Sequence, residues 1–522
     1  RNGEYRITVL SRRGDIQADE LLGHPISVAV TTPYGSVREF NGLAVGFYQV
    51  GQHNRHHQYL IVVRPWTWLL TRTSDCKIFQ DKTIRQIIEK VFADHPYADF
   101  EFHLTSSYTT WAYCVQYRES DFNFLTRLME QEGMHFFFRH QNGKHTLVIA
   151  DSLRAHVAAD HYGEVRFREP ETTHARADEG IREWSHGAEI QPTRFIQRDF
   201  NFEKPRADMQ ADAGPARPLK HQHQAAFDIF DYPGEYEERG EGQRIAAVRI
   251  EEMRHQFDHF NGEGNAAGLA TGGLFKLLEH PRDDQNQEYL IVEADYRVEE
   301  SPLESELATT ELIGLRFRAI PSAQIFHPPR LTPKPIVQGP QTAIVVGPAG
   351  DEIYTDKYGR VKVQFHWDRY GKKDQNSSCW IRVSHPWAGQ NWGMIAIPRI
   401  GQEVIVEFLE GDPDRPIITG RVYNADQMPP YALPANMTQT GIKTRSTKGG
   451  GVANFNEIRF EDKKGAEQVY IHAEKNQDIV VENDETTHVK HDRTETVGHN
   501  EVVTIGANKA ETVAVAKALS IG

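Results

Sequence analysis

The chain has 522 residues, and its 59 Lys and Arg against 73 Asp and Glu give a formal net charge of −14. At about 100–200 residues per domain this length predicts about three to five domains, and the acidic balance disfavours a nucleic-acid-binding protein. Cys76, Cys114 and Cys379 are far apart in the sequence, which indicates a reducing compartment rather than a disulfide framework. No signal-peptide pattern opens the sequence, and no run reaches the ~20 apolar residues that a membrane-spanning helix needs.

Residues 1–150 are predicted to be strands with two inserted helices. The first helix is expected over 81–94, because four apolar residues lie at i, i+3, i+4 and i+7 of one face: Ile84, Ile87, Ile88 and Val91. Thr83 and Gln86 form a capping-box pair, and Pro96 ends the helix by restricting His95.

The second helix is expected over 120–132. Phe122, Leu125 and Met129 would form its apolar stripe, and Gly133 suits the left-handed residue that follows a helix. Strands are expected around these helices at 26–30, 59–63, 135–138 and 146–149.

Residues 151–330 give fewer signals. A turn-rich segment at 231–236, a helix near 242–255 and a strand at 288–298 are expected. The proline-rich stretch 328–335 predicts a linker and a domain boundary.

After this linker the pattern changes to short strands. Val361, Val363, Phe365 and Trp367 alternate with polar residues, which is typical of a half-buried strand whose aromatic residues face a core. Further strands are expected at 380–383, 394–397, 403–408 and 417–422, separated by turns at 357–359, 388–391 and 411–414. About five strands in fewer than a hundred residues predict a small closed barrel of the OB type.

The last fifty residues carry a period of eight. One Val or Ile recurs at Val481, Val489, Val497, Ile505, Val513 and Ile521. A second register of Asp484, Asp492, Asn500 and Asn508 has the same spacing, and a partial third register consists of Gly498, Gly506 and Gly522.

Eight is an even number, so strand geometry returns the same side chain to the same face in every unit, whereas a helical heptad would drift out of phase. Asn, Asp and Gly supply turn chemistry between short strands. One apolar residue in eight cannot give a single chain a core. Intertwined identical chains would gather these residues on one axis and pair every strand edge. The alternative, a disordered polar tail, does not explain three registers held in phase.

Candidate catalytic and metal residues are weak. His221 and His223 lie two residues apart, but a zinc site needs further ligands, and the cluster of His53, His56 and His57 has the same weakness. The segment 284–288 lacks the glycine and the distal glutamate of a calcium loop. Asp412 and Asp414 could pair as carboxylates, but their Gly-Asp-Pro-Asp-Arg-Pro setting favours a rigid turn. No hydrolase or P-loop motif is present, so we expect no catalytic, cofactor or metal residue and no enzymatic activity.

A set of motifs in a fixed order carries a family resemblance. The motifs are LLGHP at 21–25, RPWTWLL at 64–70, CKIFQ at 76–80, YCVQYRE at 113–119, RLMEQEG at 127–133, DYPGEY at 231–236, DKYGRVKV at 356–363, SCWIRV at 378–383, PRIGQEV at 398–404, GDPDRP at 411–416, YN at 423–424 and NEI at 456–458. With them the chain resembles the VgrG family, the trimeric spikes of the bacterial type VI secretion system, and is similar to the hub and needle proteins of contractile phage tails.

The resemblance implies a mainly β fold with a few helices. A phage-hub-like base of two β-rich subdomains with inserted helices is expected over 1–330, an OB-fold barrel over 331–425, a connector over 426–470, and a triple-stranded β-helix shaft formed by three chains over 471–522. The chain begins inside the base and ends in phase with the repeat without an atypical closing unit, so a short N-terminal segment and the tip are expected to lie beyond it.

The same resemblance implies partners and location. The chain would form a homotrimer. Its partners would be a hexameric Hcp tube under the base, a PAAR-repeat cap or a PAAR/Rhs toxin at the C-terminal tip, and an adaptor chaperone. The spike would stay in the cytoplasm before firing and then be pushed into the target cell or the extracellular space, with membrane contact only by puncture and with no nucleic acid or cofactor bound.

Two other functions remain open from the sequence. A phage-like spike could carry a cell-wall glycan hydrolase between barrel and shaft, but the stretch from Tyr423 to about Ile479 is too short for such a domain. A secreted β-helical adhesin would require a signal sequence in the full gene.

Overall fold

The computed structural model describes residues 2–169, 179–217, 227–299 and 313–521. The chain divides into two compact units, Arg1–Pro429 and Pro430–Gly522. The described residues are mainly β, with three α-helices and five short 3-10 helices at Ala18–Glu20, Trp66–Thr71, Leu153–Ala155, Asp283–Gln285 and Leu409–Gly411. In that part of the chain no helix is long and apolar enough to cross a membrane. His221 and His223 lie outside the described residues.

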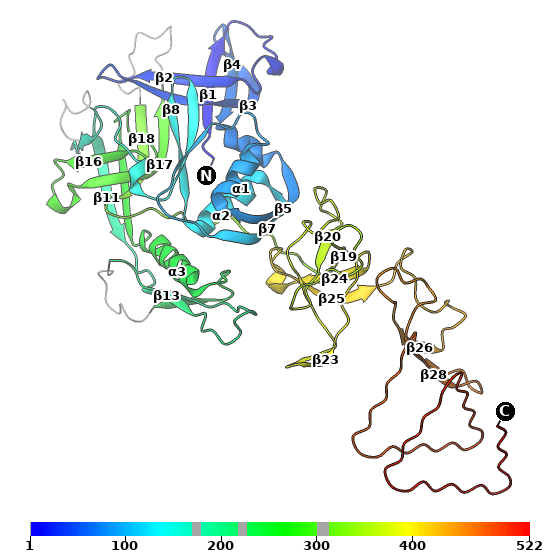
Figure 1. Cartoon of the computed structure of the whole chain (residues 1–522). Helices are drawn as coiled ribbons and strands as arrows, with labels where there is room; N and C mark the ends of the chain where they lie inside the picture. The colour runs from blue at the N-terminus through cyan, green and yellow to red at the C-terminus, as the bar shows by residue number, and fades with distance from the viewer. Residues whose placement is uncertain (1, 170–178, 218–226, 300–312, 522) are drawn as a thin grey trace. The chain divides into compact units, whose positions relative to one another are not determined.

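The first unit opens with an antiparallel sheet in the order β1-β4-β3-β2 (Figure 1). Its strands are β1 (Tyr5–Ser11), β2 (Pro25–Thr31), β3 (Val37–His53) and β4 (His56–Arg64). The sequence did not predict β3, the longest strand. Its pairing with β4 shifts register between Ala44 and Gly46 and again between Gln49 and Gly51. Such bulges interrupt the alternation of apolar and polar residues by which a strand is recognised.

Two helices fill the space between the next strands, which are β5 (Ser74–Thr83), β6 (Phe100–His103), β7 (Thr110–Ser120), β8 (His135–Gln141) and β9 (Lys144–Ala150). Helix α1 (Ile84–Phe92) starts three residues later than predicted, because β5 continues to Thr83. The capping box is confirmed: the Thr83 hydroxyl accepts a hydrogen bond from the Gln86 amide, and the Gln86 side chain accepts one from the Thr83 amide. All four apolar residues of the predicted helix face are buried.

Helix α2 (Asp121–Glu132) is confirmed together with Gly133, whose φ of 77° is left-handed. All three stripe residues face the core: Leu125 and Met129 are buried, and Phe122 is half-buried and packs against them. Phe124, which was not among the predicted residues, is fully buried and stacked on Phe79.

The second half of the base holds a six-stranded sheet in the order β10-β16-β17-β18-β15-β11. Its strands are β10 (Glu164–Arg166), β11 (Ile181–Ala188), β15 (Asp258–Gly264), β16 (Leu274–Leu278), β17 (Glu288–Val298) and β18 (Ile313–Pro321). A smaller sheet of β12 (Arg194–Gln197), β13 (Ala211–Ala213) and β14 (Asp228–Asp231) packs against α3 (Arg239–Arg254). The predicted strand at 288–298 is confirmed in full, and the predicted helix near 242–255 begins three residues earlier.

The predicted barrel is confirmed. Its five strands lie in the order β20-β19-β24-β25-β21, and the bridge between Val361 and Ile381 joins the two edges. The strands are β19 (Gln341–Val346), β20 (Lys362–Phe365), β21 (Arg382–Val383), β24 (Glu403–Phe408) and β25 (Pro416–Val422). Val361, Val363 and Phe365 lie in its core.

Two details of the barrel differ from the prediction. Gln364 is buried rather than exposed, because its amide donates to the Asp368 carbonyl and accepts from the Lys373 amide. The strand expected at 394–397 is instead β23 (Trp392–Met394), which pairs only with β22 (Trp387–Gly389) in a separate hairpin.

A buried histidine pair joins the two halves of the base. The Nδ1 of His156 donates to the Gly272 carbonyl at 2.8 Å, and its Nε2 lies 2.9 Å from the Nε2 of His135. Burial lowers the pKa of His156, and a neutral ring that donates at Nδ1 accepts at Nε2, so we assign the Nε2 of His135 as the donor of this contact. Burial, and then the neighbouring imidazole, lower the pKa of His135 to about 3.

This pair predicts loss of stability in acid. The pKa of His135 is about 3 in the folded chain and about 6.5 when unfolded. The unfolded state therefore binds the extra proton, and stability present above pH 6.5 is lost as the pH falls toward 3. Urea titrations between pH 7 and 4 give the free energy of unfolding at each pH. In His135→Gln this free energy should fall with decreasing pH less steeply than in the wild type, by about 1.4 kcal/mol per pH unit. The exposed control His24→Gln should keep the wild-type slope; an unchanged slope in His135→Gln would contradict this assignment.

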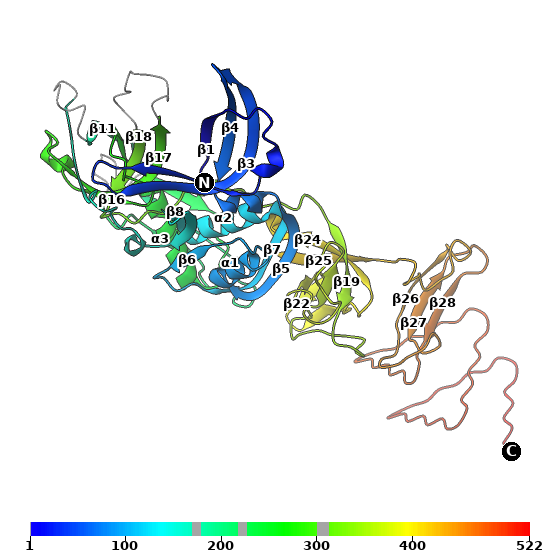
Figure 2. The ribbon, with the colours of Figure 1, turned by 90° about the horizontal axis from the view of Figure 1, so that it is seen from above.

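The second unit contains one antiparallel sheet of β26 (Gln439–Lys443), β27 (Glu457–Glu461) and β28 (Gln468–His472), in that order. Figure 2 shows the three strands side by side. Beyond β28, from 473 to 521, the chain is described without a helix or strand.

Candidate assembly interface

The second unit has no hydrophobic core of its own. Among its described residues, 430–521, only Glu457 is buried. The apolar residues of its sheet stay exposed, among them Ile442, Ile458, Phe460, Val469 and Ile471. A chain that buries no apolar surface cannot offset the conformational entropy lost on folding. This unit therefore needs a partner surface.

The octad residues form a distinct class within the tail. Val481, Val489, Val497, Ile505 and Val513 have exposed fractions between 45% and 48%. Val502 and Val515, outside the octad register, are 87% and 97% exposed. Ile521 is 85% exposed. About half of the surface of each of the first five residues is thus covered by its own chain, and the rest is exposed.

The backbone has the same period as the sequence. Bends occur at 482–483, 490–491, 498–499, 506–507 and 514–515, each directly after an octad Val or Ile. Between bends the chain runs extended, and Figure 1 shows it after β28 as a series of straight segments joined by corners.

The turn residues take fixed places in this pattern. Gly498 and Gly506 are the first residue of their bends, and Asp484, Asp492, Asn500 and Asn508 come directly after a bend. No backbone–backbone hydrogen bond is formed within the described stretch 475–521. Extended backbone in an assembled state requires such bonds, so the donors and acceptors of this stretch are available to other chains.

A largely shielded ionic cluster, with Asp412 buried and Glu235 at its exposed edge, joins the base to the barrel in the first unit. The Nζ of Lys334, from the proline-rich linker, lies 2.8 Å from Asp412, 2.9 Å from Asp414 and 3.3 Å from Glu235. Asp414 also accepts a hydrogen bond from the Val115 amide of β7 at 2.6 Å. We call Lys334, Asp412, Asp414 and Glu235 the joint.

The turn predicted at 411–414 is present, but its function in the fold was missed. Burial disfavours the charged form of Lys334, and the surrounding carboxylates outweigh it and raise its pKa. Burial and the nearby Asp414 raise the pKa of Asp412 to about 6. Beside the joint, Arg415 binds Asp199 at 2.6 Å. Side chains from the base, the linker and the barrel thus meet at a single point, where one ammonium group faces three carboxylates.

The other candidates from the sequence do not form a site. His53, His56 and His57 lie at the tip of the β3–β4 hairpin, and among the described residues no group of three His, Cys, Asp or Glu is placed to hold a metal. Asp284 is paired with Arg282 at 2.7 Å.

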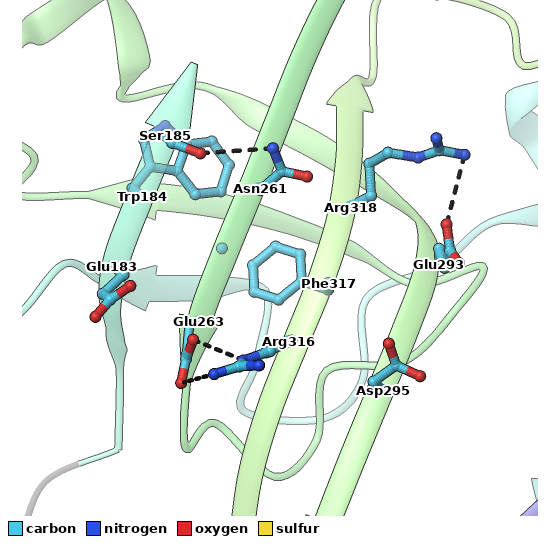
Figure 3. A pocket seen from close by; sticks show the side chains of 11 residues that line it. Glu183, Trp184, Ser185, Asn261, Glu263, Glu293, Asp295, Arg316, Phe317 and Arg318 are labelled. Carbon is cyan, nitrogen blue, oxygen red and sulfur yellow. Dashed lines mark hydrogen bonds and ion pairs between the residues drawn. The ribbon is translucent and has the colours of Figure 1, made fainter. Parts of the chain in front are cut away.

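One hollow on the base is lined by charged residues of a sheet face. Its volume is about 530 Å³, and its lining residues come from β11, β15, β18 and β17. Figure 3 shows how these side chains lie on the sheet. Arg316 lies 2.8 Å from Glu263, and Arg318 lies 3.6 Å from Glu293. The lining residues include no His or Cys, so they offer no nucleophile with an adjacent imidazole base.

Three family models match the chain in order. The phage tail baseplate hub (GPD) matches residues 1–302. The type VI secretion system/phage-baseplate injector OB domain matches 342–423, and the bacteriophage T4 gp5 C-terminal trimerisation domain matches 440–522.

Curated relatives agree with these models. The type VI secretion system spike proteins VgrG1b and VgrG1a of Pseudomonas aeruginosa are each 50% identical over 92% of this chain. The matched part makes up 65% of VgrG1b and 74% of VgrG1a. VgrG5 of the same organism is 36% identical over 92% of this chain and 61% of its own length. The chain thus spans about two thirds of these relatives.

Solved structures share the fold at low identity. The E. coli c3393 protein, described as a type VI secretion component similar to the T4 tail proteins gp27 and gp5, has a TM-score of 0.58 at 19% identity over 81% of this chain and 93% of its own. A lidded Francisella PdpA-VgrG complex has a TM-score of 0.55 at 9% identity over 90% and 74%.

A hub base, an OB barrel and a trimerisation domain in one chain define the class of contractile-tail spike proteins. Within that class, the chain belongs to the family of type VI secretion system VgrG spike proteins.

Proposed function

We propose that three copies of this chain form a rigid spike that sits on the type VI secretion tube, punctures a target membrane and carries effector cargo. The observation that carries this proposal is the second unit, which has an octad register, half-covered Val and Ile residues and no core of its own. In a trimer these residues line one axis, and the unpaired extended backbones of the three chains pair as a triple-stranded β-helix.

The mechanism is mechanical. A narrow shaft whose strand edges are all paired transmits an axial push without buckling. The joint passes the load between base and barrel, because Lys334 holds carboxylates from both sides. The base, with two β-rich subdomains per chain, presents six in a trimer, which matches the symmetry of a hexameric Hcp tube.

We infer the domain limits from the same features, with a base over 1–330, an OB barrel over 331–425, a connector over 426–470 and the shaft over 471–522. The proline-rich linker before the joint and the sheet β26–β28 between barrel and octads support these limits.

The remaining partners follow from the family. A PAAR-repeat cap or PAAR/Rhs toxin would close the tip, an adaptor chaperone would load it, and the spike would leave the cytoplasm by being pushed. The protein performs no catalysis in this proposal. The glycan hydrolase alternative has little support, because residues 424–472 hold only the three-stranded sheet β26–β28.

The proposal predicts the mass of the protein in solution. The intact chain should behave as one species of about 180 kDa, three times the 59.6 kDa of one chain, because an uncovered second unit cannot fold alone. Size-exclusion chromatography with light scattering measures this mass directly. A monodisperse monomer with a folded second unit would refute the proposal.

A further inference from the structure

The barrel carries an exposed hairpin outside its closed sheet. Strands β22 (Trp387–Gly389) and β23 (Trp392–Met394) pair only with each other, and all six residues are exposed. The arrow of β23 lies away from β19, β24 and β25 in Figure 1.

This hairpin presents large apolar side chains to solvent. Trp387 and Trp392 are 63% and 58% exposed and contact each other edge to face, with their ring centroids 5.1 Å apart. Met394 and Ile395 extend the same segment and are also exposed. Two-stranded hairpins are marginally stable in water, and a cluster of exposed Trp, Met and Ile is typical of a surface that another protein covers.

The absence of charged residues around the hairpin indicates which kind of surface can cover it. The stretch 384–398 contains no Asp, Glu, Lys or Arg, in a chain whose net charge is −14. Copies of an acidic chain repel one another, so they approach most easily where charge is absent. An uncharged apolar hairpin is suited to contact between copies.

The trimerisation domain brings the copies within reach. Strand β25 ends at Val422 and β26 begins at Gln439, a tether that spans at most about 60 Å. Chains joined through residues 440–522 therefore hold their barrels at an effective concentration in the millimolar range. The tether itself exposes more apolar residues, namely Tyr423, Met428, Leu433 and Met437.

We propose that the hairpin 387–394 docks on a neighbouring copy of this chain, forming a second inter-subunit interface ahead of the shaft. Under three-fold symmetry each hairpin contacts the next copy, and the ring of contacts closes. This inference rests on the proposed trimer. It adds that the barrels of the three copies contact one another directly, instead of being held together only through the shaft.

Hydrogen exchange measured by mass spectrometry tests the inference on the full chain. The amides of 387–394 should exchange at least about tenfold more slowly in the trimer than in the Val497→Asp, Ile505→Asp variant, whose broken shaft leaves monomers. Slow exchange in both proteins would mean that the hairpin is protected by contacts within its own chain. Fast exchange in both would mean that no copy of the chain covers it, so that it is free to bind another partner. Either result overturns the inference. Light scattering on the same samples reports the trimer separately, so failure of the trimer is distinguished from failure of the hairpin contact.

A substitution provides a second readout. In Trp387→Ser, Trp392→Ser the shaft is intact, so the protein should remain trimeric at high concentration but dissociate at a lower urea concentration than the wild type. The control Ile190→Ser, which removes an equally exposed apolar residue of the base, should dissociate at the wild-type concentration. Equal midpoints for all three proteins would contradict the interface.

Discussion

Replacing Val497 and Ile505 by Asp is expected to abolish the trimer. Both residues belong to the octad register and are about half covered by their own chain. In three intertwined chains the substitutions place six carboxylates on one axis without counter-ions. A single unpaired buried charge costs about 3–5 kcal/mol, so several together exceed what a domain of ordinary stability can lose. Light scattering should report a mass near 59.6 kDa instead of three times that value.

A control for this experiment lies in the same segment. Val502 and Val515 are the most exposed valines between the octad positions. Val502→Asp, Val515→Asp introduces the same charges at the wrong register, and it should keep the trimer and most of its melting temperature. If both double variants remain trimeric with unchanged melting, the octad residues do not form the axis, and the shaft assignment is wrong.

The second large effect is expected at the joint. Lys334→Met removes the cation that Asp412, Asp414 and Glu235 share, and leaves the buried Asp412 and the partly buried Asp414 without a counter-ion. We expect the free energy of unfolding of the first unit to fall by about 3–5 kcal/mol, because breaking a buried ion pair from one side leaves an uncompensated charge. Urea unfolding followed by tryptophan fluorescence measures this loss.

Two variants make the joint experiment specific. The exposed lysine Lys372, replaced by Met, should change the unfolding free energy by no more than about 0.5 kcal/mol. Adding Asp412→Asn and Asp414→Asn to Lys334→Met should restore part of the loss. The new side-chain amides need no counter-ion, and the amide oxygen at position 414 can still accept a hydrogen bond from the Val115 backbone. If Lys334→Met behaves like the Lys372 variant, the joint does not hold base and barrel together.

Local patterns were the reliable part of the sequence prediction. The apolar face and capping box of α1 are present because they depend on residues within one turn of each other. The sequence predicted the barrel strands β20, β21, β24 and β25 but not β19 (Gln341–Val346), and it predicted the octads from their period. In contrast, β3 was missed because two bulges break its alternation. Phe124 was not predicted to be in the core, because helical spacing alone does not show how wide the buried face of a helix is.

The sequence by itself determined the organisation of the protein: a β-rich base, a small barrel and a tail with an octad register. Each of these follows from residues close together along the chain, where periodicity and turn chemistry operate. Only the tertiary structure decided where Lys334 points and that β22 and β23 leave the barrel sheet. The three carboxylates paired with Lys334 lie 78, 80 and 99 positions away along the chain, and no local sequence pattern predicts such a contact. Such a contact forms because an ammonium group shielded from water is stable only when it is paired, whichever parts of the chain supply the carboxylates.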